Sequence, residues 1–292
     1  MRVLVTGAGG QLGIEVVEEL TRRAGSVVHG PGLDVVGADH SRLDVADRDA
    51  ALAAIVMLEP DIVIHAAAWT AVDACESDAD RAFQVNALGT RHVAEAASLV
   101  GAHLTYVSTD YVFDGTSPRP YVEWDLPNPR SVYGASKLGG EHEALRAQLG
   151  ATVVRTSWVC GRHGTNMVKT VLRLLQGAGP LAFVDDQHGS PTIASDLAVA
   201  IVDLSLGRRP GIFHVTNSGA TTWYGFACAI AAAVGEDPGR IRPIATAQLE
   251  PPRPAPRPAN SVLDNAALRL SGLATLPDWR ESLGRLLVEL AP

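Results

Sequence analysis

The stretch Arg2-Val3-Leu4-Val5-Thr6-Gly7-Ala8-Gly9-Gly10-Gln11-Leu12-Gly13 decides the fold, because it runs from an apolar strand through a glycine turn into a helix. Glycines in such a turn let the backbone approach a pyrophosphate closely, and the start of the helix offers free amide groups to the phosphates. We therefore predict a dinucleotide site that begins with Gly7, Gly10, Gln11, Leu12 and Gly13. The alternative is a plain strand-to-helix turn that holds no ligand.

Outward from this turn, the first half of the chain alternates short β-branched runs with longer helical patterns. This alternation is typical of βαβ units, which build a parallel sheet. We predict strands over residues 2–6, 35–38, 62–66, 104–108 and 152–156, and helices over residues 11–23, 48–58, 78–100 and 131–149. The first, third and fourth strands are nearly all apolar, as expected of strands buried on both faces.

The second half of the chain is less regular, with helices predicted over residues 166–176, 195–206 and 224–234 and a strand over 211–215. Together the two halves predict an α/β fold. A Rossmann-type doubly wound parallel sheet over residues 1–157 is followed by a smaller α/β substrate-binding domain over residues 158–292. Segments of the two ranges are free to interleave.

The composition excludes several classes of protein. Of the 292 residues, 47% are hydrophobic and 19% are charged, which fits a packed core rather than a disordered chain. No apolar run approaches the roughly 18–20 residues that cross a bilayer, and no secretory signal is present, so we expect a cytoplasmic protein without a membrane partner. The net charge is −8 and the basic residues are dispersed, which argues against a nucleic-acid partner.

Metal and hydrolase chemistry find no support in the sequence. Cys75, Cys160 and Cys228 are widely separated, so they predict neither a disulfide framework nor a zinc site. No group of histidine, aspartate and glutamate residues has metal-ligand spacing, and we expect no metal. The GxSxG motif of serine hydrolases is absent.

The adenosine end of the predicted dinucleotide site depends on the second strand. An acidic residue at its end would bind the ribose, and Asp39 is our candidate, with Asp34 as its rival. Arg42 nearby could instead accept a 2′-phosphate, so the choice between NADH and NADPH stays open here. Asp44 and Val45 suit the adenine edge, although an aspartate before a helix is equally often an N-cap.

The third strand ends in Ala66, Ala67 and Ala68, where a nicotinamide ribose would have to pass close to the backbone. Small side chains leave that room, and the carboxyl ends of parallel strands are where such sheets bind ligands. We include these alanines in the cofactor site, with simple packing as the alternative.

Tyr133 and Lys137 stand four residues apart in a predicted helix and therefore share one face. A fixed positive charge favours a phenolate, so we predict that Lys137 lowers the pKa of Tyr133 from about 10 and makes it a proton donor and acceptor. Ser108 and Thr109, at the end of an apolar strand, offer a hydroxyl to the same reacting oxygen. These residues predict a hydride-transfer site. A surface Tyr–Lys pair would not explain why one of only two lysines stands here.

Residues 251–258 read Pro-Pro-Arg-Pro-Ala-Pro-Arg-Pro, which excludes a helix or a central strand because proline lacks the amide donor. We predict an extended loop. A solvated linker is the usual meaning of such a run, and the alternative is that Arg253 and Arg257 face an anionic ligand.

These motifs together resemble the dTDP-4-dehydrorhamnose reductase family of extended short-chain dehydrogenases, over nearly the whole chain. The GxxGxxG spacing fits that group, and the runs Ser-Thr-Asp-Tyr-Val-Phe-Asp-Gly at 108–115 and Asp-Asp-Gln-His-Gly-Ser-Pro-Thr at 185–192 are far more specific. Further similar segments are 66–73, 133–137, 155–159 and 257–258. The chain departs from the family pattern at His65, at Cys75 and in an insertion around residues 30–32.

The resemblance implies reduction of a dTDP-linked 4-keto-6-deoxysugar by NADPH or NADH, as in rhamnose biosynthesis. It implies Tyr133 as the acid, Lys137 on the nicotinamide ribose, and Thr109 tuning the tyrosine. Substrate contacts are implied for Thr109, Asp110, Trp158, Gln187 and Arg257. Two other readings stay open: a ketoreductase or epimerase of another deoxysugar pathway, and a dinucleotide-binding regulatory subunit without turnover. A homodimer is compatible with each of them.

Overall fold

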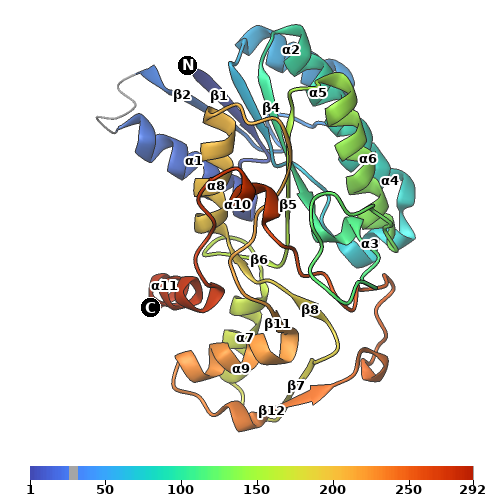
Figure 1. The fold of residues 1–292 in the computed structure, drawn as a ribbon, viewed down its shortest axis with the longest axis vertical. Coiled ribbons are helices and arrows are strands. Elements are labelled where there is room, and N and C mark those ends of the chain that lie inside the picture. Colours follow the sequence, from blue (N-terminus) through green and yellow to red (C-terminus); the bar gives the residue numbers. More distant parts are fainter. Residues whose placement is uncertain (26–31, 292) are drawn as a thin grey trace.

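A parallel sheet of six strands forms the centre of the structure, a computed structural model that describes residues 1–25 and 32–291 (Figure 1). The strands follow the order β10-β5-β4-β3-β1-β2, and every neighbouring pair is parallel. Their bounds are β1 (Arg2–Thr6), β2 (Asp34–Ala38), β3 (Ile62–His65), β4 (His103–Thr109), β5 (Thr152–Thr156) and β10 (Gly211–His214). The predicted doubly wound α/β fold is confirmed, and each predicted strand is correct to within one residue at either end. The first residues of the expected insertion around 30–32 lie outside the described part of the chain.

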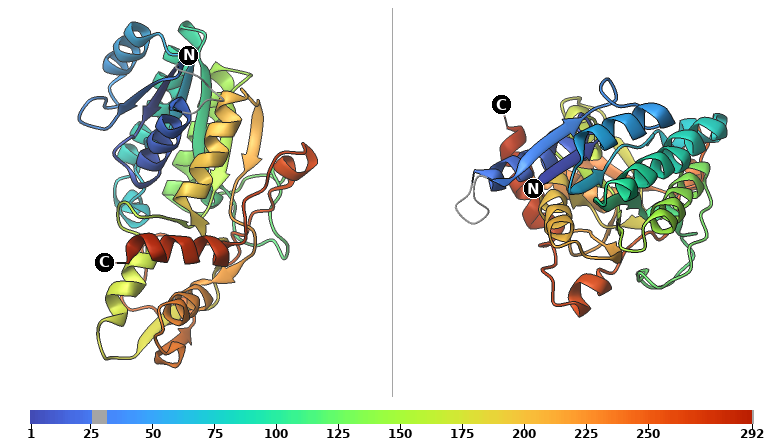
Figure 2. Two further views of the ribbon diagram at one scale, coloured as in Figure 1. Left: turned by 90° about the vertical axis from the view of Figure 1, so that its left-hand side faces the viewer. Right: turned by 90° about the horizontal axis from the view of Figure 1, so that it is seen from above.

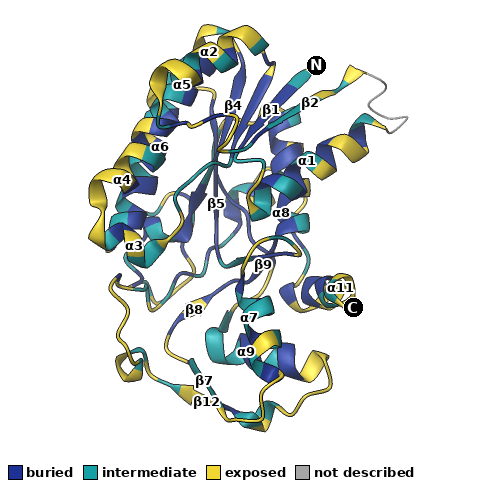
Figure 3. Cartoon of the chain, turned by 180° about the vertical axis from the view of Figure 1, so that it is seen from behind, coloured by how far each residue is buried: buried dark blue, intermediate teal, exposed yellow. Residues whose placement is uncertain are grey.

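Helices cover both faces of this sheet, as Figures 1 and 2 show. Apolar residues of α2 (Arg48–Leu58), α5 (Gly89–Leu99) and α6 (Val132–Ala147) pack on one face, and those of α1 (Gln11–Ala24) and α8 (Ala194–Leu206) on the other. The central strands are apolar because they lie between these two layers. Figure 3 shows the buried strands at the centre and the exposed outer faces of the helices.

The strand order reverses at β1 and β3, since β2 lies on one side of β1 and the later strands lie on the other. A crevice opens beyond the carboxyl ends of the strands at such a reversal, and ligands of doubly wound sheets bind there. Gly7, Ala66 and Asp110 directly follow β1, β3 and β4. The fold therefore gathers the predicted site residues at one edge of the sheet.

A smaller part of the molecule lies beyond these carboxyl ends (Figure 1). It contains α7 (Met167–Leu175), α9 (Trp223–Ala233), α11 (Trp279–Leu290) and three two-stranded sheets, which pair β6 (Val159–Cys160) with β9 (Thr192–Ile193), β7 (Leu181–Val184) with β12 (Ile241–Ile244), and β8 (His188–Gly189) with β11 (Thr221–Thr222). Its apolar core includes Phe226 and Trp279, whose rings meet edge-on at 5.5 Å. No helix in the described ranges is long and apolar enough to cross a membrane.

Two elements from the second half of the chain belong to the part of the molecule that is built around the six-stranded sheet. β10 adds the sixth strand of the sheet beside β5, and α8 packs against α1. We propose that the dinucleotide-binding domain consists of residues 1–157 together with these two elements, and that most of residues 158–292 form the smaller domain.

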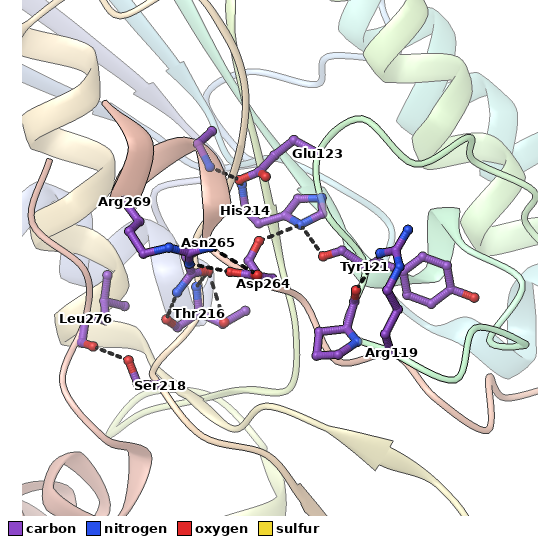
Figure 4. Close-up of polar contacts among 12 residues, drawn as sticks. Arg119, Tyr121, Glu123, His214, Thr216, Ser218, Asp264, Asn265, Arg269 and Leu276 are labelled. Carbon is purple, nitrogen blue, oxygen red and sulfur yellow. Dashed lines mark hydrogen bonds and ion pairs between the residues drawn. The ribbon is translucent and has the colours of Figure 1, made fainter. Parts of the chain in front are cut away.

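Polar contacts fasten the C-terminal segment to β10, as Figure 4 shows. The His214 ring Nδ1 lies 3.1 Å from the Tyr121 carbonyl and 3.2 Å from that of Asp264, so it donates to backbone oxygens. The Asn265 amide bonds the backbone of Thr216 in both directions, at 3.1 and 2.7 Å. These bonds hold the chain that leads from the proline run back to α10 (Ala266–Leu270).

The predicted single helix over residues 78–100 is wrong in one respect. α3 (Val72–Ser77) and α4 (Ala79–Phe83) precede a π-helical turn over Gln84–Leu88, which then continues as α5. The extra residue of a π turn turns Asn86 toward the backbone of Trp69, which it binds through its side chain at 2.8 and 3.1 Å. The sequence analysis also left α10, α11, β7 and β12 unassigned, and short 3-10 turns stand at Asp110–Val112, Pro238–Arg240 and Thr246–Gln248.

Candidate active site

A cavity of about 650 Å³ lies at the strand reversal, and we call its floor of small residues the dinucleotide cradle: Gly7, Gly10 and Ala66, Ala67 and Ala68. Most of the predicted cofactor residues line this cavity. They are Gly7, Gly10, Asp39, Asp44, Val45, Ala66, Ala67 and Ala68. The sequence analysis missed seven further lining residues: Gly9, His40, Ser41, Leu43, Trp69, Arg81 and Val85.

Close backbone contacts require glycine at two positions of the turn, Gly7 and Gly13. Gly7 has φ +72°, and a Cβ there would lie 2.6 Å from the amide nitrogen of Ala67. A Cβ at Gly13 would collide with the carbonyl oxygen of Gly7. The turn thus brings β1, β3 and the start of α1 together, and the first turn of α1 leaves amide groups without intrahelical partners. A pyrophosphate fits this arrangement.

Three predicted cofactor residues are not among those that line the cavity: Gln11, Leu12 and Gly13. The Gln11 amide donates to the Val159 carbonyl at 2.9 Å and accepts from the Asn166 side chain at 2.8 Å. The Gln11 side chain therefore connects α1 to the smaller domain, and any contact with the cofactor falls to its backbone.

Asp39, the candidate for the ribose, lines the cavity. Its carboxylate accepts from the Ser41 hydroxyl at 2.7 Å and from the Ser41 amide at 3.0 Å, and the hydroxyl bond is the main reason that its pKa lies below the usual range. The rival Asp34 begins β2 at the opposite end of the strand, where it pairs with Arg2 at 2.7 Å. Asp44 lines the cavity, and the N-cap of α2 is Asp47 instead.

Lys137 is buried beneath the site. Its ammonium donates to the Val107 carbonyl at 2.7 Å and lies 4.2 Å from the centre of the Tyr106 ring. Burial lowers its pKa to about 7, although the Glu141 carboxylate, one helical turn further along α6, raises it. Lys137 is therefore a buried cation that titrates near neutral pH.

Tyr133 lies beside Thr109, but one sequence-based prediction about it is wrong. Burial raises the pKa of Tyr133 above its ordinary value, and a hydrogen bond with Thr109 lowers it only in part. The charged groups that act on the phenol include Asp110, which raises the pKa further. The expected lowering by Lys137 is not found: Lys137 is not among the groups that shift the pKa of Tyr133, and burial is the largest cause of the shift.

The two hydroxyl groups at the end of β4 face different partners. Ser108 donates to the Glu141 carboxylate at 2.5 Å, and Glu141 also forms a buried, two-point ion pair with Arg155. Thr109 donates to Asp110 at 2.9 Å, and burial raises the pKa of Asp110 to about 6. Thr109 thus contacts both Asp110 and Tyr133, whereas Ser108 is bonded to the buried Glu141–Arg155 pair.

His65 forms a buried link that the sequence analysis did not assign. Its Nδ1 lies 2.6 Å from the Thr6 hydroxyl, and its Nε2 lies 3.2 Å from the Thr90 hydroxyl. The Thr90 hydroxyl donates to the Asn86 carbonyl, so the imidazole donates to Thr90 from Nε2 and accepts from Thr6. Burial lowers the pKa of His65 to about 3, which keeps the ring neutral.

A second set of residues includes three for which the sequence predicts substrate contacts, and we call it the substrate wall: Trp158, Trp223, Gln187 and the proline run 251–258. The rings of Trp158 and Trp223 stack with centres 3.4 Å apart and planes at 6°. Gly189 is required behind them, because a Cβ there would collide with the Trp158 ring. Trp223 was missed from the sequence, which gave no signal that it meets Trp158.

Gln187 and Arg257 are both engaged with protein groups. Gln187 donates to the Thr246 hydroxyl at 2.9 Å, which leaves its carbonyl oxygen for another partner. Arg257 forms a two-point ion pair with Asp73 of α3 at 2.8 and 2.9 Å. The proline run is therefore docked on α3 through Arg257, which argues against the alternative of a solvated linker.

One cluster of metal-ligating groups exists among the described residues. Oxygen and nitrogen atoms of Glu15, Glu18 and His163 lie within 4.8 Å of one another. The Arg162 guanidinium donates to Glu15 at 3.3 Å and to Glu18 as well, so a protein cation already neutralises these carboxylates. Spacing along the sequence could not reveal this cluster, because its members come from distant segments.

Comparisons with known proteins fit this geometry. A family model described as the RmlD substrate binding domain matches residues 1–291. A dTDP-4-dehydrorhamnose reductase of Mycobacterium tuberculosis is 42% identical, over 98% of this chain and 92% of the relative. The chain belongs to the dTDP-4-dehydrorhamnose reductase family. A Streptomyces antibioticus protein named probable dTDP-4,6-dihydroxy-2-methyloxan-3-one 4-ketoreductase is also 42% identical, over 97% of this chain and 93% of that protein.

Solved structures show the same fold. The dTDP-4-dehydrorhamnose reductase of Bacillus anthracis, determined in complex with NADP, has a TM-score of 0.92 and 38% identity and covers 99% of each chain. A UDP-glucose 4-epimerase of Thermus thermophilus in complex with NAD has a TM-score of 0.82 and 26% identity, over 98% of this chain and 97% of that one. The family that the sequence motifs indicated is thereby confirmed.

Proposed function

We propose that this chain is an NAD(P)H-dependent oxidoreductase that reduces the 4-keto group of a dTDP-linked 6-deoxysugar. The preferred reaction converts dTDP-4-dehydro-L-rhamnose to dTDP-L-rhamnose in rhamnose biosynthesis. One observation carries the proposal: in a member of the dTDP-4-dehydrorhamnose reductase family, Tyr133 is hydrogen-bonded to Thr109 and stands one helical turn before Lys137 on α6.

A reduced nicotinamide cofactor, when bound, supplies the hydride for the carbonyl carbon. Tyr133 supplies the proton for the carbonyl oxygen. Because burial raises the pKa of its phenol, Tyr133 is protonated at neutral pH and able to donate. Thr109 holds the phenol in place, and Tyr133 regains its proton from water after the alcohol has formed.

Lys137 is proposed to hold the ribose next to the nicotinamide. Its ammonium is fixed by the Val107 carbonyl and the Tyr106 ring, which limits its movement. The Ala66–Ala68 segment lines the cavity with small side chains, which leave its backbone accessible. Both contacts orient the cofactor toward Tyr133, and orientation of the reactants contributes much of the rate in reactions of this type.

The cofactor is NADPH or NADH. The Bacillus anthracis relative was solved with NADP and the Thermus thermophilus neighbour with NAD. In this chain the charged Asp39 at the cavity rim favours a free ribose 2′-hydroxyl over a 2′-phosphate. Arg81 lines the same cavity and stacks on Trp69 at 4.7 Å, which places one cation near the site for a phosphate.

The substrate wall receives the sugar nucleotide in this proposal. The stacked Trp158 and Trp223 offer a flat aromatic face to a ring. Thr109 and Asp110 face the sugar, Gln187 has a free carbonyl oxygen for a hydroxyl, and Arg257 supplies positive charge for the diphosphate.

An assay of NADPH absorbance with dTDP-4-keto-rhamnose, combined with NMR of the product stereochemistry, tests this function. We expect one NADPH consumed for each dTDP-L-rhamnose formed. An epimerase would return its hydride and leave the absorbance unchanged, and a regulatory subunit would bind NADPH without turnover. Either result would contradict the proposal.

A second candidate is reduction of a different 4-keto-deoxysugar. The Streptomyces antibioticus ketoreductase supports it, because its identity of 42% equals that of the Mycobacterium tuberculosis reductase. Competition between the two keto sugars under the same assay separates these candidates through their kcat/KM values.

The proposal includes a cytoplasmic location, a homodimer and no nucleic-acid partner. Light scattering of the purified protein measures the number of subunits, and fractionation of the producing cells measures the location.

A further inference from the structure

The proline strap, residues Pro251–Pro258, crosses from the smaller domain to α3 of the first domain and is fixed there by one carboxylate. Asp73 accepts from the Ala255 amide at 3.2 Å and from both terminal nitrogens of Arg257 at 2.8 and 2.9 Å. Ala255 itself is buried. The second arginine of the strap, Arg253, also donates to Asp73, at 3.4 Å. Asp73 therefore holds the strap by its backbone and by both of its arginines.

The far end of the strap is held by close packing. Gly115 has φ +79°, and a Cβ there would lie 2.5 Å from the Cβ of Pro258. The Asn260 amide donates to the Gly115 carbonyl at 3.1 Å. The strap therefore ends against the segment that follows β4 and the Thr109–Asp110 pair in the chain.

The guanidinium of Arg257 uses only one of its two edges in these contacts. Nη1 donates to Asp73 and to the Ala255 carbonyl at 2.8 Å, and Nη2 donates once to Asp73. A guanidinium has five N–H groups. The Nε–H and the second Nη2–H of Arg257 therefore have no hydrogen-bond partner among the described residues. These two groups point along the same edge, which is the fork that grips two oxygens of a phosphate.

Arg257, which carries this unused edge, lies close to Tyr133, the proposed proton donor. Burial and Asp110 raise the pKa of Tyr111, whereas the positive charge of Arg257 lowers it, so the guanidinium acts across a short distance on that phenol. The Tyr111 ring meets the Tyr133 ring edge-on at 5.6 Å. Arg257 is thus near the candidate proton donor while its outer edge is free.

We propose that Asp73 is a positioning residue for substrate binding, which holds Arg257 by one edge and thereby presents the Nε–Nη2 edge to the diphosphate of the sugar nucleotide. The inference rests on the proposed function, in which Arg257 binds the diphosphate. Asp73 does not touch the substrate itself. It acts by removing the freedom of a long side chain before the ligand arrives, which lowers the entropy lost on binding.

The opposite relation would be competition, in which the diphosphate must displace Asp73 from Arg257. The two relations predict opposite changes in the affinity for the nucleotide when Asp73 is removed. If Asp73 competes, its removal tightens binding of the nucleotide; if it positions, its removal weakens binding. The free edge of Arg257 and the added hold on the Ala255 amide favour positioning.

The test is titration of the full-length protein with dTDP, followed by calorimetry, for wild type, Asp73→Ala and the nearly isosteric Asp73→Asn. We expect the Kd for dTDP to rise about tenfold in Asp73→Ala and several-fold in Asp73→Asn. The kcat at saturating sugar nucleotide and the Kd for NADPH stay unchanged. An unchanged or lower Kd for dTDP in a folded Asp73→Asn variant overturns the proposal.

Two further variants show whether Asp73 acts through Arg257. Asp73→Ala added to Arg257→Ala should cause no further loss, and an additive loss overturns the proposal. Arg257→Lys should bind dTDP about as weakly as Arg257→Ala, because an ammonium lacks the second edge. Asp80→Asn is the matched control, since Asp80 is exposed on the neighbouring α4 and its carboxylate has no partner among the described residues.

Failure of the proposed function gives a different pattern. If the wild-type protein does not bind dTDP, or if Arg257→Ala binds it as tightly as wild type, the assignment of Arg257 is wrong and the role of Asp73 falls with it. If Arg257→Ala loses affinity while both Asp73 variants keep it, only the positioning role is wrong.

Discussion

The dinucleotide cradle and the substrate wall are built in different ways. The cradle comes from two short segments at the ends of β1 and β3, and its contacts are between backbones, as at Gly7 and Ala67. The wall comes from several distant segments, and its contacts are between side chains, as at Trp158 and Trp223. A cradle of this kind accepts almost no substitution, whereas a wall can be altered one side chain at a time.

Tyr133→Phe should have the largest effect, because Tyr133 is the proposed proton donor. The substitution removes the transferable proton and keeps the ring in its packing. Turnover should fall by roughly two to four orders of magnitude, the usual contribution of a general acid. Steady-state kinetics measure the loss, and titration should show unchanged affinity for both NADPH and dTDP. Near-native turnover would remove Tyr133 from the mechanism.

Gly7→Ala should damage the cradle alone. A Cβ at Gly7 meets the backbone of Ala67 at 2.6 Å, and the residue has φ +72°. We expect the Kd for NADPH to rise at least about tenfold while the Kd for dTDP stays within twofold. Gly101→Ala is the matched control, since Gly101 has φ +70° and no atom within 4 Å of its Cβ position.

That control separates backbone strain from the clash. A left-handed conformation costs an alanine about 1–2 kcal/mol, so both variants should lose some thermal stability. Only Gly7→Ala should bind NADPH more weakly. If Gly101→Ala weakens NADPH binding equally, the cradle has no special role.

Trp223→Ala should damage the wall alone. Loss of the stacking partner leaves Trp158 without its fixed plane, so the KM for the sugar nucleotide should rise about tenfold with NADPH affinity unchanged. Trp124→Ala, which removes a tryptophan that is 66% exposed, is the control. A KM change in both variants, or in neither, would show that the stack does not form part of the substrate site.

The buried charge of Lys137 should appear in the pH dependence of stability. Its pKa is about 7 in the folded protein and 10.5 in a solvated lysine, so the unfolded chain binds more protons between these values. The free energy of unfolding of wild type should therefore rise, relative to Lys137→Met, as the pH increases from 7 to 10, by at least about 1 kcal/mol. Denaturant unfolding at several pH values measures this difference. Parallel curves for the two proteins would contradict the burial of the charge.

Asp39→Ala should have the smallest effect, confined to the choice of cofactor. Without the carboxylate, the ratio of kcat/KM for NADPH to that for NADH should rise by a few-fold, since a negative charge repels a 2′-phosphate. Asp34→Ala is the control, because Asp34 pairs with Arg2 at the other end of β2. A shift of equal size in the control would exclude Asp39 from the ribose site.

The sequence predicted the cradle better than the wall, for a physical reason. The glycine turn and the alanine segment are local patterns, and a strand followed by a helix places them in only one way. The parallel sheet follows from the same alternation. The π turn at Gln84–Leu88 escaped prediction because it depends on a bond from Asn86 to the distant Trp69.

Contacts between distant segments carried no sequence signal. The stack of Trp158 on Trp223 and the ion pair of Asp73 with Arg257 each join residues far apart in the chain. The prediction of a lowered pKa for Tyr133 was wrong for a related reason. The spacing places Lys137 on the same helix face, but only the packed structure shows that the phenol is buried and that the ammonium faces the Val107 carbonyl.

β10 is synthesised long after the strand that it pairs with, and this affects how the unfinished chain folds. β5 pairs with β4 on one side and with β10 on the other, and β10 begins only at Gly211. While the ribosome has released only the first half, the fully buried β5 has an unpaired edge, and the face that α8 later covers is open. Unpaired edges of apolar strands pair with other chains, so a fragment that ends near residue 157 should aggregate rather than fold as a free dinucleotide-binding unit.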